Sequence, residues 1–192
     1  LNADPKVFDK AQLIPQMSYN EAIEQAYYGA TVIHPKTLQP LYQKEIPLFV
    51  KSFQNPNEPG TAILKDKNMA DHICCYMILE HQTLITLSTL DFSYIMEKQF
   101  IKIAGLLDSY HMKVRLTQNS AISLSVCFSD PFNYKERLLQ DLRANYKLTI
   151  QENVKLYTIT NPKTDHPPFI SSITGILMKQ FTEKRLQFVT TA

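Results

Sequence analysis

Glycine is scarce in this sequence, with four residues among 192, and tryptophan is absent. Phosphate-binding loops need closely spaced glycines, because only a residue without a side chain lets the backbone amides approach a phosphate. The sequence has no G-x-x-x-x-G-K-[ST] loop, no G-x-G-x-x-G fingerprint and no G-x-S-x-G elbow. These absences argue against a nucleotide-dependent enzyme that is complete within this sequence.

Metal-binding patterns are also missing. The five histidines are scattered, with no H-x-x-x-H or H-E-x-x-H spacing, and the three cysteines form no C-x-x-C pair. Cys74, Cys75 and Cys127 are odd in number and lie in apolar runs, so we expect buried free thiols and no metal site. Free thiols favour a reducing compartment and therefore a cytoplasmic protein.

Charge and hydropathy exclude two further classes of partner. The net charge is +2 with no Lys/Arg cluster, which argues against nucleic acid. The longest apolar run, residues 73–79, is far shorter than the roughly 20 residues that span a bilayer. Residues 1–10 hold two Asp and two Lys and resemble no signal peptide, so we expect no membrane partner.

The first helix is predicted over residues 18–30. Ser18 and Glu21 have the S-x-x-E spacing of a capping box, in which the two side chains satisfy backbone amides at the helix start. Gly29 lies near the end, where a left-handed residue often terminates a helix.

A second short helix is predicted over 34–45, with Pro35 in its first turn. A strand is predicted over 46–53, and residues 55–60 are rich in turn formers. We therefore expect a domain boundary near residue 60.

Beyond that boundary the pattern of hydrophobic residues predicts an α+β fold. The predicted elements are strands 72–80 and 83–90, helix 93–111, strands 112–118 and 121–128, helix 129–146 and strand 147–151. Residues 83–151 thus have the ferredoxin-like β-α-β-β-α-β order, with four antiparallel strands and both helices on one face. A shorter second copy follows, with strand 153–160, helix 167–181 and strand 184–191, and strand 72–80 could complete its sheet.

Particular residues fix the predicted faces and ends of these elements. Helix 93–111 carries an apolar stripe of Met96, Phe100, Ile103, Ala104 and Leu107. Asp130 is the predicted N-cap of the helix at 129–146. Strand 121–128 alternates, with one face formed by Ile122, Leu124, Val126 and Phe128 and the other by Ser123, Ser125 and Cys127. The second face has no aromatic residue, which argues against base stacking as in an RNA-binding sheet.

Two loops could form a small-ligand site. Residues 91–96 lead into a helix N-terminus, which attracts carboxylates, and residues 117–121 bring Gln118, Asn119 and Ser120 into a tight turn. Together they could bind a zwitterion such as an amino acid. The alternative is that Ser93 only caps the helix and that the turn only joins two strands.

Several motifs resemble those of the aspartate kinase family. The segments "ADPK", "MSYNEA", "GATVIHPKT", "IPLFV" and "PNEPGT" resemble the C-terminal end of its catalytic domain. The segment "LITLSTLDFSYIMEKQFIKIAGLLDSYHMKVRLTQNSAISLSV" resembles its first ACT domain, and "VKLYTIT" with "KRLQFV" its second. The resemblance implies tandem ACT units and three regions: a kinase-domain remnant at 1–60, a first ACT domain at 61–151 and an incomplete second ACT domain at 152–192.

The resemblance also implies a function. Aspartate kinases phosphorylate the side-chain carboxylate of aspartate with ATP and Mg²⁺ and open the synthesis of lysine, threonine and methionine. Their ACT pair binds an end-product amino acid, usually lysine or threonine, and forms dimers. This sequence begins just before the family's A-D-P-R segment and lacks its phosphate-holding K-F-G-G-T-S stretch, so we expect no kinase activity from this chain alone.

Carried over by motif, the resemblance implies two sets of contacts. Asp4 and Lys6 would lie on the ATP side of a complete kinase site, and Thr31 replaces the family lysine. The effector contacts would be Phe92, Ser93, Phe100, Val114, Arg115, Gln118, Asn119 and Ser120. Lysine-inhibited relatives have Asp at the position of Arg115. An Asp there would attract a ligand ammonium group, whereas Arg115 would repel it. Lysine, threonine, another metabolite or no ligand therefore stay open.

Three interpretations follow. The leading one is an amino-acid-sensing regulatory region that dimerises through its ACT units. The second is a dimerisation module whose effector site has decayed. The third is a separate regulatory subunit that pairs with a full-length kinase chain.

Overall fold

The computed structural model describes residues 1–5, 8, 11–30, 33–65, 73–91, 93–162, 164 and 173–191. The chain folds into two compact units. Unit 1 comprises Leu1–Leu79, Tyr157–Ser172 and Lys179–Phe188, and unit 2 comprises Glu80–Leu156, Ile173–Met178 and Val189–Ala192.

Unit 1 begins with a small α/β layer. Its elements are β1 (Gln16–Ser18), α1 (Tyr19–Tyr27), α2 (Pro35–Gln43), β2 (Leu48–Val50) and β3 (Thr61–Leu64). The sheet order is β1-β3-β2, with β1 parallel and β2 antiparallel to β3. The core beneath this sheet consists of Ile14, Met17, Tyr19, Ala22, Leu38, Ile63 and Cys75.

The predicted start of α1 is confirmed, and Gly29 has the predicted left-handed backbone, but the helix ends at Tyr27 and not at residue 30. Ser18 Oγ accepts a hydrogen bond from Glu21 N at 3.1 Å, and Ser18 N donates to Glu21 Oε2 at 2.9 Å. Gly29 has φ +117°, and a Cβ there would lie 2.8 Å from Leu79 Cδ2. Glycine is thus favoured by its backbone conformation, and any side chain there would also force the Leu79 side chain to shift.

The His34-Pro35 pair starts α2, as predicted for Pro35. His34 is the N-cap residue, and its Nδ1 accepts from Lys36 N at 3.2 Å. Proline fits the first turn because its missing N–H would have no intrahelical partner. His34 therefore has a structural role in the chain.

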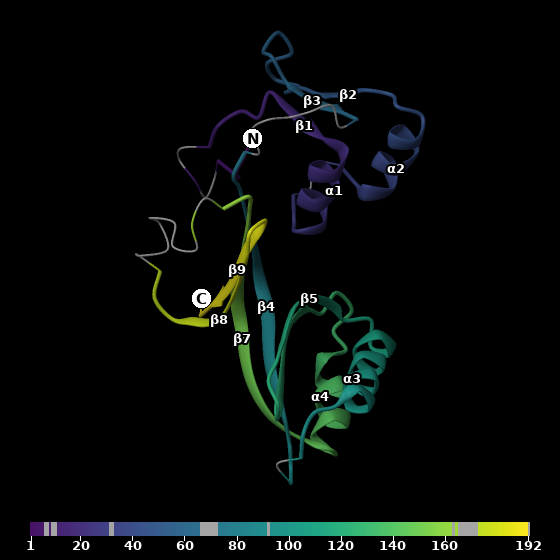
Figure 1. Ribbon diagram of the computed structural model, residues 1–192, viewed down its shortest axis with the longest axis vertical. Helices are drawn as coiled ribbons and strands as arrows, with labels where there is room; N and C mark the ends of the chain where they lie inside the picture. The colour runs from purple at the N-terminus through teal and green to yellow at the C-terminus, as the bar shows by residue number, and fades with distance from the viewer. Residues whose placement is uncertain are drawn as a thin grey trace. The chain divides into compact units, whose positions relative to one another are not determined.

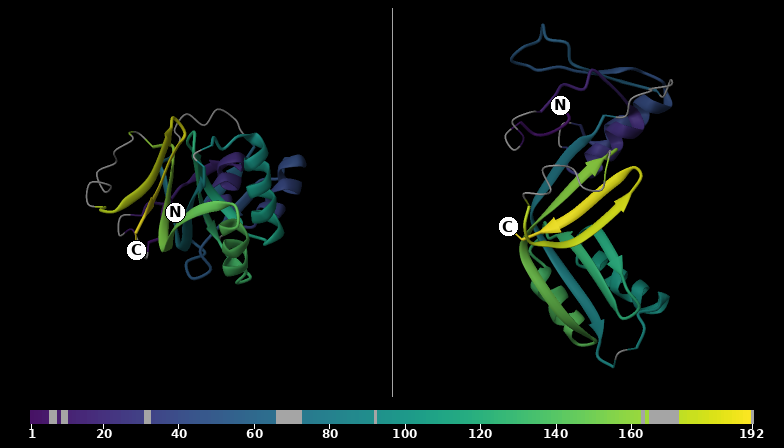
Figure 2. Two further views of the ribbon diagram at one scale, coloured as in Figure 1. Left: turned by 90° about the horizontal axis from the view of Figure 1, so that it is seen from below. Right: turned by 60° about the vertical axis from the view of Figure 1, so that its left-hand side comes forward.

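Unit 2 is built around the predicted β-α-β-β-α-β order. The elements in this order are β4 (Cys75–Thr89), α3 (Glu97–Ser109), β5 (Lys113–Asn119), β6 (Ser123–Ser129), α4 (Lys135–Arg143) and β7 (Tyr146–Thr160). The start of β4, up to Leu79, and the end of β7, from Tyr157, belong to unit 1. The sheet order runs β5-β6-β4-β7-β9-β8, and β6 is antiparallel to both β4 and β5. Both helices lie on the same face of these strands (Figures 1 and 2). The α+β fold class is confirmed.

Helices α3 and α4 cover the sheet with one continuous core. The buried side chains are Ile85, Leu87, Ile103, Leu107, Met112, Leu124, Val126, Phe128, Leu138, Leu139, Leu142 and Tyr146. Of the residues predicted for the inward face of this strand, Leu124, Val126 and Phe128 are buried, whereas Ile122 is 39% exposed and precedes the strand. Cys127, predicted for the opposite face, is buried as well, so this strand is covered on both sides at that position.

Strands β4 and β7 differ from the prediction, because each is continuous where the sequence predicts two strands. Each strand contains one residue with left-handed backbone: His81 has φ 55° and Asn153 has φ 54°. The two side chains meet at 2.8 Å between Nδ1 and Oδ1, and Glu80 pairs with Lys155 at 3.1 Å. The polar residues that indicated strand ends therefore mark a local irregularity shared by both strands.

The helix predicted over 167–181 is wrong in its described part. Gly175 has φ 72°, and the chain then forms β8 (Ile176–Thr182) and β9 (Arg185–Thr190). Residues 167–172 lie outside the described residues. Thr182 Oγ1 accepts from Arg185 N at 3.1 Å and closes the hairpin. The strand predicted over 184–191 is confirmed as β9.

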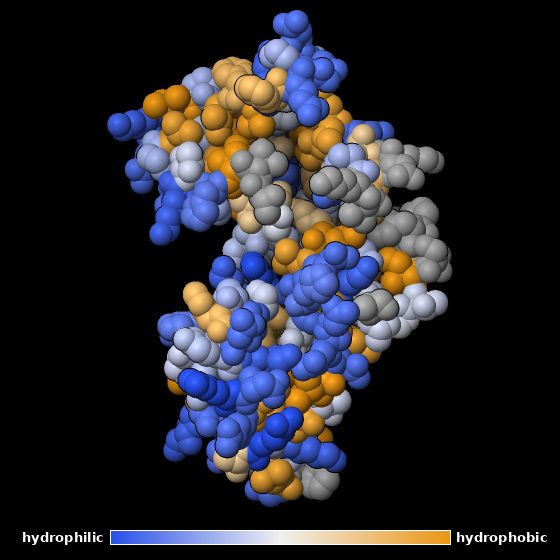
Figure 3. All heavy atoms as spheres, turned by 180° about the vertical axis from the view of Figure 1, so that it is seen from behind, coloured by the Kyte–Doolittle hydropathy of each residue, from blue (hydrophilic) through white to orange (hydrophobic). Residues whose placement is uncertain are grey.

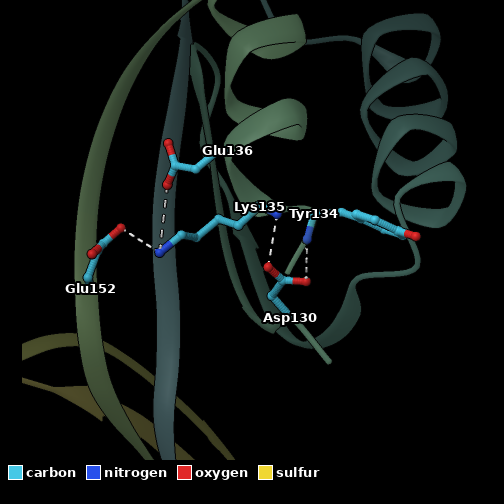
Figure 4. A network of polar contacts seen from close by, with 5 residues as sticks. All are labelled: Asp130, Tyr134, Lys135, Glu136 and Glu152. Atoms are coloured by element: carbon cyan, nitrogen blue, oxygen red, sulfur yellow. Dashed lines mark hydrogen bonds and ion pairs between the residues drawn. The ribbon is translucent and has the colours of Figure 1, made fainter. Parts of the chain in front are cut away.

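The predicted helix starts in unit 2 are too early. Helix α4 begins at Lys135, after the N-cap residue Tyr134, and not after Asp130. The Asp130 carboxylate still accepts from Tyr134 N at 3.0 Å and Lys135 N at 2.9 Å (Figure 4). Lys135 Nζ reaches Glu152 Oε1 on β7 at 2.6 Å and so links this helix start to the sheet.

The cysteines are free thiols, as predicted: Cys75 and Cys127 are buried and Cys74 is half-buried. Burial raises the pKa of Cys75 to about 11 and that of Cys127 to about 12, since it disfavours the thiolate.

We predict that a thiol reagent at pH 8 modifies one thiol per native chain and three in denaturant. Cys74→Ser should leave no reactive thiol in the native chain. Because the unfolded cysteines lose their protons near pH 8.5 whereas the folded ones retain them, the free energy of unfolding should also fall as pH rises above 9. Two or more fast-reacting native thiols would contradict this prediction.

Candidate effector site

A groove of about 610 Å³ lies in unit 2 where the start of α3 meets the end of β5. Ile95 N donates to Ala121 O at 2.9 Å and so holds the segment before α3 against the β5–β6 turn. The lining residues are Tyr94, Ile95, Met96, Glu97, Phe100, Ile101, Asn119, Ser120 and Ala121. The groove is therefore apolar with a few polar groups at its ends, which is typical of a small-molecule site.

A second groove of about 280 Å³ lies alongside, between α3 and the β5–β6 strands. Phe100 borders both grooves. The other residues that line the second groove are Ala104, Leu107, Asp108, Met112, Val114, Thr117, Leu124 and Val126.

The outer face of α3 differs from the predicted apolar stripe. Ile103 and Leu107 are buried, whereas Met96 is 57% and Phe100 44% exposed, and Ala104 is exposed as well. Neighbouring Ile101, which the stripe omits, is 70% exposed. The helix thus carries apolar side chains that unit 2 itself does not cover.

Four of the predicted effector residues line these grooves: Phe100, Val114, Asn119 and Ser120. Ser120 is occupied by the turn, because its Oγ accepts from Ser123 N at 3.1 Å and its N donates to Ser123 O at 2.8 Å. Within the described part of the chain, the Asn119 side chain has no hydrogen-bond partner. Asn119 is therefore the polar side chain best able to bind a ligand in the larger groove.

Gln118 lies on the other face of the strand. In the β5–β6 ladder Asn119 pairs with Leu124, whose side chain is in the helix-side core, whereas Gln118 pairs with Ser125. Successive strand residues point to opposite faces, so Gln118 faces away from both grooves.

Arg115 lies at a bulge, where the β5–β6 register shifts between Val114 and Leu116. Its positive charge is close enough to Cys127 to lower the pKa of that thiol, against the larger effect of burial. Because Val126 and Phe128 face the helices, Cys127 faces the opposite side. The structure thus places Arg115 near that side of the sheet.

Ser93 does not cap α3, because the N-cap residue is Met96, which makes no side-chain capping bond. Instead Ser93 N donates to Asp91 Oδ1 at 3.1 Å, and Thr89 Oγ1 donates to Ser93 O at 2.7 Å. The hydrogen bonds from Ser93 lower the pKa of Asp91. Ser93 therefore shapes the loop that leads into the groove.

Three predicted contacts remain, namely Asp4, Lys6 and Phe92. Phe92 and Lys6 are outside the described residues. Asp4 is exposed in unit 1, where its carbonyl oxygen accepts from Phe8 N at 2.9 Å.

The sequence prediction included Tyr94 only as part of the 91–96 loop and missed Glu97 and Ile101 as groove residues. The available signal was their helical spacing, since Glu97 and Ile101 are four residues apart just after that loop.

Two general features complete the description. Among the residues with described positions, no group of three His, Cys, Asp or Glu side chains could hold a metal ion, and no helix is long and apolar enough to cross a membrane. Hydrophilic residues cover most of the face shown in Figure 3, and hydrophobic side chains emerge in separate groups.

The fold of unit 2 is that of an ACT-type unit, and it follows a short α/β segment. The profile of the Amino acid kinase family matches residues 1–52. Aspartokinase 1, chloroplastic, of Arabidopsis thaliana is 28% identical over 141 residues, which cover 73% of this chain and 25% of the relative. Lysine-sensitive aspartokinase 3 of Escherichia coli (strain K12) is 27% identical over 164 residues, covering 81% and 36%.

A solved structure shows the same fold. Aspartate kinase from Clostridium acetobutylicum matches with a TM-score of 0.85 and 22% identity, over 100% of this chain and 48% of that chain. Over most of its length, the chain is similar to the C-terminal part of aspartokinases, and the resemblance of its motifs is confirmed. The chain spans about a quarter to a third of the length of these two curated relatives.

Proposed function

We propose that this chain is a regulatory region of an aspartokinase, in which the larger groove of unit 2 binds a small amino acid. The observation that carries the proposal is the groove itself, where the free amide of Asn119 lies beside the uncapped start of α3. A helix start offers amide donors to an α-carboxylate, and Glu97 can attract an α-ammonium group. The name of the lysine-sensitive relative supports an amino acid as the effector class.

The lining favours an uncharged amino-acid side chain. Tyr94, Met96, Phe100 and Ile101 surround the groove, and Glu97 is its one acidic lining residue among those described. A lysine ligand would need a carboxylate for each of its two ammonium groups. Threonine therefore fits better than lysine, and both belong in a binding screen.

The second part of the proposal is a homodimer formed through unit 2. Strand β5 is an edge of the sheet, and the exposed apolar side chains of α3 lie next to it. An uncovered strand edge beside an apolar helix face is suited to pairing with a second copy of itself.

The kinase reaction would be carried out by a complete enzyme that contains this region. Such an enzyme would use ATP and Mg²⁺ to phosphorylate the aspartate side chain, and this chain would contribute Asp4 and Lys6 to its ATP side. The first 60 residues would be a kinase-domain remnant, and 61–151 and 152–192 the two ACT regions. The buried thiols support a reducing, cytoplasmic setting.

We predict that threonine or lysine at millimolar concentration raises the melting temperature by several degrees, since ligand at 100 times Kd adds about 2.7 kcal/mol to folding stability. Asn119→Ala should abolish the rise, because it removes the free amide. Gln118→Ala is the matched control and should retain it. An equal loss in both variants would place Gln118 in the site, and a flat screen would favour the decayed-site interpretation.

We also predict that the chain elutes with twice its mass of 22.1 kDa in size-exclusion chromatography with light scattering. Ile101→Glu should yield the monomer, because it places a charge within the apolar face. Lys102→Glu changes an exposed neighbour on the same helix and should leave the dimer intact. A monomeric parent chain that co-purifies with a full-length kinase chain would favour the separate-subunit interpretation.

A further inference from the structure

Within unit 1, helix α1 and the residues that end it contact β4 and β9 at three points. Gln25 Nε2 donates to Cys75 Sγ at 3.1 Å, and Gly29 packs directly on Leu79. The third point is Tyr28, which meets Arg185 of β9 across 157 residues of sequence. The first two contacts involve β4, so Arg185 alone among these three links the helix to the C-terminal hairpin.

Arg185 binds α1 in three ways at once. Its Nη1 donates to the Tyr28 hydroxyl, its guanidinium carbon lies 5.0 Å from the centre of the Tyr28 ring, and Nη1 is 3.8 Å from Glu24 Oε2. A planar guanidinium can stack on a ring and donate hydrogen bonds together, which a lysine ammonium cannot reproduce.

The backbone on each side of this contact is fixed. Thr182 and Arg185 exchange hydrogen bonds across the β8–β9 turn, at 3.1 and 3.2 Å. Tyr28 is the C-cap residue of α1, its N donates to Glu24 O at 3.0 Å, and only 9% of its surface is exposed. Since both ends are held, a shift of the hairpin must either carry α1 with it or break the contact.

We propose that Arg185 is a positioning residue that clamps α1 to β9. Through this contact at the β8–β9 turn, the six-stranded sheet controls the position of the helix. Helix α1 lies within residues 1–52, the segment that matches the amino acid kinase family. The clamp therefore connects the last strand of the chain to its kinase-like segment. The clamp stands on the contacts alone, whereas its regulatory use rests on the proposed effector site.

Hydrogen exchange on the whole chain tests the clamp. Arg185→Met should speed amide exchange in the second half of α1 about tenfold. In this variant, local opening of the helix no longer has to break the contact between Arg185 and Tyr28. Lys184→Met is the matched control, because Lys184 is the neighbouring cation in the same turn and, like Arg185, lines a groove of about 910 Å³ in unit 1. It should leave α1 exchange unchanged. Equal exchange in the parent chain and Arg185→Met, or equal acceleration in both variants, would overturn the clamp.

A double-mutant cycle adds a second measurement. Tyr28→Phe keeps the ring but removes the hydroxyl, and combining it with Arg185→Met should accelerate exchange less than the product of the two single effects. Arg185→Lys retains the charge and should give an intermediate rate, and it serves if Arg185→Met fails to fold. Independent, multiplicative effects would show that the two side chains do not act together.

The regulatory use is tested with threonine and lysine at millimolar concentration. In the parent chain, the amino acid that raises the melting temperature should also slow exchange in α1. In Arg185→Met it should still raise the melting temperature but no longer slow α1. Slowing in both chains would refute control through the clamp. A flat melting screen would refute the effector site and the clamp's regulatory use, and the exchange rates without ligand would still decide the clamp itself.

Discussion

The burial of one face of the unit 2 sheet is the constraint on which the rest of the structure depends. Helices α3 and α4 pack against that face alone, so the apolar residues of β4 and β6 must keep their register. A shift by one residue would turn Leu124, Val126 and Phe128 away from the helices. The same constraint fixes the β5–β6 turn against the start of α3, and the larger groove is the space left between them.

The sequence was sufficient to predict elements whose signals are local. The capping box at Ser18 and the proline in the first turn of α2 depend on neighbouring residues only, and both are as expected. The alternation in β6 and the β-α-β-β-α-β order are also as predicted, because the spacing of apolar residues along an element follows from which of its faces is buried.

The errors occur where tertiary contacts override local signals. The polar residues around His81 and Asn153 resemble strand ends, but each strand continues because its neighbour carries a matching irregularity. The apolar run that begins at Ile176 fits a helix or a strand equally well, and pairing with β9 decides the outcome. The exposed side of α3 has a similar origin: an apolar stripe on a helix does not say whether its own domain or another chain covers it.

The candidate site was predicted only in part, again because tertiary structure decides which residues lie together. Neighbouring positions in a turn can point to opposite sides of a sheet, and motif similarity does not reveal which. Register separates Asn119 from Gln118, and the bulge moves Arg115 towards Cys127. The charge that seemed to select against a lysine ligand thus lies near a different surface from the groove.

The contact between His81 and Asn153 makes two positions that are distant in sequence depend on each other. Each residue adopts a left-handed backbone that β-branched side chains rarely tolerate, and each supplies one side of the bond between the strands. A substitution that straightens one strand leaves its neighbour still irregular at the same level. The irregularity therefore depends on both residues, although they lie 72 positions apart in sequence.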